Sequence, residues 1–129
     1  MTGRDHALRV FERAVEEWWA LAAMLDAAVF NDTIFGFHAH QVAEKALKAW
    51  LSALDLEYPP TRDLGRLLSL LEENGHWVAP FDCLIELDLF AAHLLEEAYA
   101  DLGEPIARAR IVESLEVLLA DVRFVLGLA

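Results

Sequence analysis

The feature that most constrains this 129-residue chain is its helical period. Apolar side chains recur every three or four residues through almost the whole sequence, and the runs stop at Pro, Gly and Asn. No segment shows the strict alternation of apolar and polar residues that is typical of a strand. Because the connections are short, neighbouring helices are expected to run mostly antiparallel. The sequence therefore predicts one all-α domain, residues 1–129, folded as an up-and-down bundle of about five helices.

The stops divide the chain into five predicted helices. They are expected at about 5–29, at 33–54, as a short helix between Thr61 and Asn74, at 81–102 and from 105 onward. Asn31, Asp32 and Thr33 offer capping oxygens before the second helix, and Thr61 is the predicted N-cap of the third. Gly75 suits the left-handed position that follows a helix. Trp50 lies on the apolar stripe of the second helix, so it is expected in the core or in an interface.

The charge of the chain narrows the choice of partners. The formal net charge is −12, spread along the sequence, so we expect weak or no binding to nucleic acid. Hydrophobic residues make up 57% of the chain, which is high for its length. We expect a homodimer to cover the excess apolar surface, and the alternative is a Leu- and Ala-rich core buried within one copy. Cys83 is the only cysteine and lies in an apolar stretch, where we expect a buried thiol. No leader pattern or membrane-spanning run is apparent, and the predicted location is the cytoplasm.

The second predicted helix carries the best candidate for a polar site. His38, Gln41, Lys45 and Lys48 follow one another at spacings of three, four and three, which aligns them on one helix face. An imidazole, an amide and two ammonium groups on one face are able to hold a phosphate or a carboxylate. The alternative is a solvated face in which Glu44 and Lys48 form an ordinary i, i+4 ion pair.

Other chemistry has less support. His40 and Glu44 lie one helical turn apart, as a pair of metal ligands would, but two ligands do not make a site. We therefore predict no metal and no cofactor. No nucleophilic triad or Gly-rich phosphate loop is present in the sequence. The four tryptophans are expected to pack in the core or in an interface rather than to stack on bases.

The second predicted helix contains Gln41 and the run Ala43-Glu44-Lys45-Ala46-Leu47-Lys48, and a proline loop and Thr61-Arg62-Asp63-Leu64 follow it. With these motifs, residues 35–71 resemble the HEPN family of small helical prokaryotic domains. Arg62 replaces the histidine that is usual there. The resemblance adds Arg62 and Asp63 to the candidate binding residues. It also implies a dimeric bundle that pairs with a small nucleotidyltransferase, and it raises the expectation of nucleotide binding.

Several HEPN branches are ribonucleases, some of them toxins, with an Arg-x4–6-His motif late in the bundle. This chain has no such spacing, since His76 and His93 lack the preceding arginine and no histidine follows Arg108 or Arg110. Glu96, Glu97, Asp101 and Glu104 would repel a phosphodiester at the corresponding place. We therefore predict no catalytic residues and a binding module of a toxin–antitoxin-type pair. The alternatives are a ribonuclease with a diverged active site, dependent on Arg108 or Arg110, and a purely structural dimer.

Overall fold

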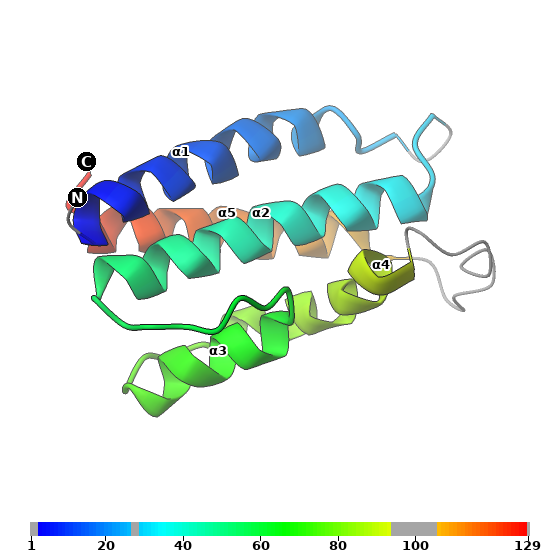
Figure 1. The fold of residues 1–129 in the computed structure, drawn as a ribbon. Helices are drawn as coiled ribbons and strands as arrows, with labels where there is room; N and C mark the ends of the chain where they lie inside the picture. Colours follow the sequence, from blue (N-terminus) through cyan, green and yellow to red (C-terminus); the bar gives the residue numbers. More distant parts are fainter. Residues whose placement is uncertain (1–2, 27–28, 94–105, 129) are drawn as a thin grey trace.

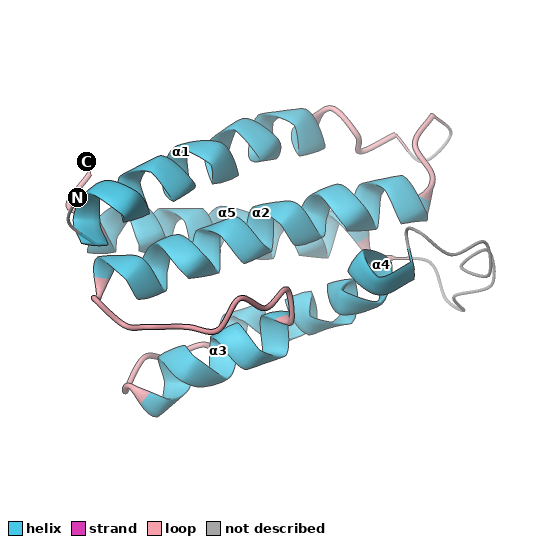
Figure 2. Ribbon diagram, in the orientation of Figure 1, coloured by secondary structure: helices cyan, strands magenta, loops and turns pink. Residues whose placement is uncertain are grey.

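The computed structural model describes residues 3–26, 29–93 and 106–128, and every regular element within these ranges is helical. The elements are α1 (Gly3–Ala22), α2 (Asp32–Ala53), α3 (Leu64–Glu73), a 3₁₀ helix η1 (Ala79–Leu87), α4 (Asp88–His93) and α5 (Arg108–Val125). Figure 2 shows the helical elements and the extended loop that connects α2 to α3. The predicted all-α bundle of about five helices is confirmed. In the same ranges, no helix is long and apolar enough to cross a membrane.

Helix α2 is the central element of the bundle. It packs against α1, α3, η1, α4 and α5 (Figure 1). Its apolar positions are buried almost throughout, including Phe35, Leu47 and the predicted core residue Trp50. Asn31 caps its start by accepting a hydrogen bond from the Ile34 amide at 2.9 Å, as the sequence predicts. Side chains on the remaining polar stripe of α2 are therefore held at the centre of the molecule, between its neighbours.

The connection between α2 and α3 sets the direction of α3. Residues 55–63 run back along α2, so α3 starts near the level of His40 and runs parallel to α2 (Figure 1). The cap of α3 differs from the prediction. Asp63, not Thr61, accepts the hydrogen bond from the Arg66 amide, whereas Thr61 accepts one from the Asp63 amide. Thr61 thus supports the capping residue from outside the helix.

Helix α1 ends at Ala22, earlier than the predicted end near residue 29. The Arg108 guanidinium donates to the carbonyls of Met24 and Phe30 and to the Asp32 carboxylate. These hydrogen bonds tie Met24 and Phe30, which follow α1, to the start of α5. The same arginine fixes the start of α5 to the start of α2.

The predicted fourth helix is wrong in its first half. Residues 79–87 form a 3₁₀ helix, and the described α-helix that follows is Asp88–His93. The rest of that prediction, the acidic residues Glu96, Glu97, Asp101 and Glu104, and the predicted fifth-helix start at Pro105 lie outside the described residues.

Cys83 is half-buried rather than buried, and its thiol lies 3.0 Å from the Ser114 hydroxyl. Gly75 has a φ of +85°, which confirms its predicted role after α3.

Candidate functional site

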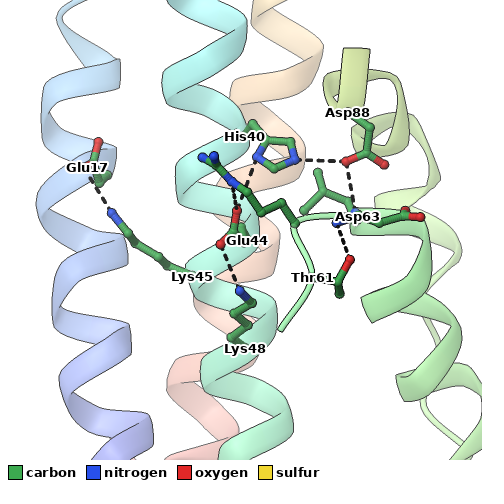
Figure 3. A network of polar contacts seen from close by, with 10 residues as sticks. Glu17, His40, Glu44, Lys45, Lys48, Thr61, Asp63 and Asp88 are labelled. Atoms are coloured by element: carbon green, nitrogen blue, oxygen red, sulfur yellow. Dashed lines mark hydrogen bonds and ion pairs between the residues drawn. The ribbon is translucent and has the colours of Figure 1, made fainter. Parts of the chain in front are cut away.

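A network of polar side chains lies on α2 where it faces α3 and α4 (Figure 3). Its members, which we call the His40 network, are His40, Glu44, Lys48, Arg62 and Asp88. They come from α2, from the segment before α3 and from the start of α4. The network therefore joins three parts of the bundle through charged groups.

His40 is the buried centre of this network, with 0% of the residue exposed. Its Nε2 lies 2.9 Å from Asp88 Oδ1, and its Nδ1 lies 3.6 Å from Glu44 Oε1. A carboxylate oxygen accepts hydrogen bonds, so Nε2 carries the hydrogen and donates a hydrogen bond to Asp88 Oδ1. Nδ1 has no hydrogen-bond partner among the described residues, and it is aimed at Glu44.

Asp88 connects the histidine to α3. Its Oδ1 also accepts a hydrogen bond from the Leu64 amide at 3.0 Å. That amide is one of the first in α3, where no carbonyl of the helix itself is available as a partner. One carboxylate oxygen thus satisfies a buried imidazole and a helix terminus at the same time.

Glu44 forms ion pairs with both cations of the network. Its Oε2 lies 3.0 Å from Lys48 Nζ, and its Oε1 lies 3.3 Å from Arg62 Nε. The Glu44–Lys48 contact is the i, i+4 pair that the sequence allows as the alternative to a binding site. Arg62 remains 56% exposed at its side chain, and only its Nε is paired with Glu44.

A second glutamate, Glu17 of α1, lies on the other side of the predicted face. It lies 3.2 Å from Lys45 Nζ and 3.5 Å from His38 Nδ1. Figure 3 shows Glu17 reaching across from α1 to Lys45. The α2 face therefore has a glutamate beside each of its lysines.

The six predicted binding residues are brought near one another, but not as one open cation cluster. His38, Gln41, Lys45 and Lys48 are all half-buried along α2. Arg62 and Asp63 lie across Glu44 from them and line an open pocket of about 350 Å³ with Asp88 and Ala91. The sequence reasoning missed Asp88 and Glu17, which arrive from other helices. One signal was readable: His40 falls on the apolar stripe of α2, and a buried histidine needs a polar partner.

Metal binding finds no support in the part of the chain that the structure describes. No group of three or more His, Cys, Asp or Glu side chains there has the arrangement of a metal site. His40 and Glu44, the pair with metal-ligand spacing, face each other.

The two arginines of the ribonuclease alternative differ in their surroundings. Arg108 is about one-tenth exposed and is bound to Asp32 at 2.9 Å, with its guanidinium 4.9 Å from the centre of the Phe35 ring. Arg110 is exposed and lines a separate pocket with Glu113 and Ser114. Arg108 is therefore a structural anchor, whereas Arg110 is open to solvent.

The comparisons with known proteins agree with the architecture. The family model of the HEPN domain matches residues 7–128, nearly the whole chain. The comparison with curated proteins and the comparison with solved structures find no match. The match begins in α1 and ends after α5. It therefore covers α2, which carries the HEPN motif and which we call the signature helix, together with the other elements that contribute to the His40 network. This chain belongs to the HEPN domain family.

Proposed function

We propose that this HEPN domain is a non-catalytic binding module. It forms a homodimer and pairs with a nucleotidyltransferase in a toxin–antitoxin-type pair. The observation that carries the proposal is that the cations on and beside the signature helix are already paired, since Lys45, Lys48 and Arg62 each lie within 3.3 Å of a glutamate. A face whose cations are already paired is poorly suited to stabilise the charge that develops when RNA is cleaved.

The ribonuclease alternative would need a free cation and a base close together. Arg108 is occupied by Asp32 and two backbone carbonyls. His40, the best-placed imidazole, is fully buried and holds Asp88. Arg110 is the exposed arginine that remains from this alternative, and Glu113 lies in the same pocket. These surroundings favour the binding module over the enzyme.

Besides these protein partners, a nucleotide is a candidate ligand. Arg62 keeps its terminal N–H groups beside the pocket that it shares with Asp63 and Asp88. A phosphate there would compete with Glu44 for the guanidinium, so binding should be weak and should fall as salt rises. Calorimetric titration with AMP and ATP tests this candidate, with Arg62→Gln expected to abolish any heat of binding.

The proposal is tested by oligomeric state and RNA cleavage in the same preparation. Sedimentation at micromolar protein should show twice the mass of the 14.5 kDa chain, and labelled RNA should stay intact. Cleavage that disappears in Arg110→Ala, with an unchanged unfolding midpoint, would establish the enzyme instead. A monomer that leaves RNA intact would remove the dimer from the proposal.

The partner is tested separately from the dimer. The expectation is that a nucleotidyltransferase gene lies beside this one and that the two purified proteins elute together from a sizing column. Two proteins that elute separately at micromolar concentration would contradict the pairing.

A further inference from the structure

We propose that a second copy of this chain docks on the face formed by α1 and α5, with Trp19 of each copy in the groove of the other. We further propose that Glu116 of each copy faces Arg123 of its partner copy. This inference rests on the homodimer of the proposed function and assigns its interface. It involves neither the signature helix nor the His40 network.

A groove between α1 and α5 provides the receiving surface. Its volume is about 310 Å³, and it is lined by Val15, Trp18 and Trp19 from α1 and by Glu116, Leu119, Ala120 and Arg123 from α5. Five of these seven side chains are apolar. Both helices bury their opposite sides against α2 or the rest of the core, through residues such as Phe11 and Leu115. The groove is thus an apolar depression on the outer side of the bundle.

Large apolar side chains are exposed in the groove and next to its lining residues. Trp19 is 70% exposed and Phe124 is 84% exposed, although both rings are of a size that is normally buried. On α5, Val117, Ala120 and Phe124 are spaced three and four apart, so they form one outward stripe opposite the buried Leu115, Leu118 and Val122. An apolar stripe on the outside of a helix indicates a neighbour on that side.

Charge favours a second copy as that neighbour. Two chains of net charge −12 repel each other over most of their surfaces. The groove is lined by one glutamate and one arginine, so its charges balance. Two copies therefore meet here at lower electrostatic cost than through a strongly acidic face.

The symmetry of a dimer makes the same two charges complementary. In a two-fold interface every contact between two different residues occurs twice. If one residue of the first copy contacts a second residue of the other copy, the second residue of the first copy contacts the first residue of the other. Glu116 and Arg123 lie two turns apart on α5, on the side that lines the groove. Two α5 helices crossing antiparallel bring each Glu116 opposite the partner copy's Arg123, forming the pair twice.

Charge reversal tests this arrangement. Glu116→Arg and Arg123→Glu should each weaken the dimer by about tenfold or more, because each change converts two attractive contacts into two repulsive ones. The double variant Glu116→Arg/Arg123→Glu should restore the dissociation constant to near that of the wild type. Sedimentation equilibrium measures all four proteins, and circular dichroism establishes that each remains helical.

Two tryptophans provide a matched pair of controls. Trp19→Ala should weaken the dimer, whereas Trp77→Ala, which removes a ring that is 77% exposed in the loop before η1, should leave it unchanged. A dimer that persists unaltered in Trp19→Ala and both single reversals would overturn this interface while leaving the proposed function intact. Weakening without rescue in the double variant would refute the reciprocal pair. A monomeric wild type would refute the dimer itself.

Discussion

Single buried polar residues in this bundle are satisfied by groups far away in the sequence. His40 pairs with Asp88, and Arg108 pairs with Asp32 and with the carbonyl of Met24. The spacing of residues along α2 predicted the Glu44–Lys48 pair, because both members belong to one helix. It contained no information on Asp88 or Glu17, whose positions depend on how α4 and α1 pack. The candidate site was therefore predictable within a helix and not between helices.

The shared oxygen of Asp88 leads to a prediction about stability. Asp88→Ala removes the partner of the buried His40 and of the Leu64 amide, so the free energy of unfolding should fall by about 2–4 kcal/mol. Asp88→Asn keeps an acceptor oxygen at the same place and should cost clearly less. Urea denaturation compares the two variants. Equal losses would mean that the hydrogen bonds of Oδ1 are not what stabilises this junction.

Arg108 and Arg110 form a matched pair for a second prediction. Arg108→Ala removes the donor of two carbonyls and the ion pair of Asp32, which still accepts from the Ile106 amide. It should lower the free energy of unfolding by about 2–4 kcal/mol. Arg110→Ala, two residues along and exposed, should change it by less than about 0.5 kcal/mol. Thermal or urea unfolding of both variants checks the difference, and similar effects would contradict the anchoring role of Arg108.

Asp121 of α5 gives a prediction about pH. Burial raises the pKa of this carboxyl above its ordinary value, because desolvation penalises the charged form. The folded state then holds the proton more tightly than the unfolded state, so this residue lowers stability as pH rises through its folded pKa. Asp121→Asn should therefore raise the unfolding midpoint at neutral pH and lose that advantage below the ordinary pKa of an aspartate. An advantage of equal size in acid would contradict the prediction.

At the scale of elements, the sequence predicted α2 and α3 well but misjudged the segment before α4. Caps and stops such as Asn31 and Gly75 act locally, so they can be read directly. The buried residues Phe81, Leu84, Leu87 and Phe90 repeat every three positions. Three residues per turn is the period of a 3₁₀ helix, so this spacing favours the observed 3₁₀ helix over the predicted α-helix. The early end of α1, at Ala22, has no Pro, Gly or Asn stop beside it in the sequence.

Close packing of α2 against α4 gives the prediction at this scale. A Cβ atom on Gly36 would lie 2.4 Å from Cγ of Phe90, far inside van der Waals contact. Gly36→Ala should therefore destabilise the fold by about 1–3 kcal/mol through overpacking, and the gain of about 1 kcal/mol in helix propensity offsets this only in part. Urea denaturation measures the change.

Two further variants test the cause of that loss. In Gly65→Ala the nearest atom to the new Cβ is the Asp63 carboxylate oxygen at 3.2 Å, so a small shift of one side chain accommodates it. Its effect should be clearly smaller than that of Gly36→Ala. Adding Phe90→Leu to Gly36→Ala should recover part of the loss. No recovery would show that contact with the Phe90 ring is not the reason.

The whole molecule combines a strongly acidic surface with a charge-balanced apolar face. Its net charge of −12 opposes contact with polyanions and with other copies alike. The groove between α1 and α5 adds apolar area where the local charges cancel. Association of copies and binding of RNA should consequently respond to salt in opposite directions. Repulsion between acidic copies opposes association, whereas attraction between cations and phosphates is needed for RNA binding.

That opposition is the last prediction. Raising salt from about 50 to about 300 mM screens the repulsion between two acidic copies, so the dimer should become tighter. The Glu116–Arg123 pairs weaken under the same conditions, but exposed pairs contribute only about 0–1 kcal/mol each, which is too little to reverse the trend. Any binding to RNA should weaken over the same range as counterion release becomes less favourable. Sedimentation equilibrium and fluorescence anisotropy of labelled RNA measure the two curves. A dimer that dissociates as salt rises would mean that ion pairs, and not the apolar face, hold the copies together.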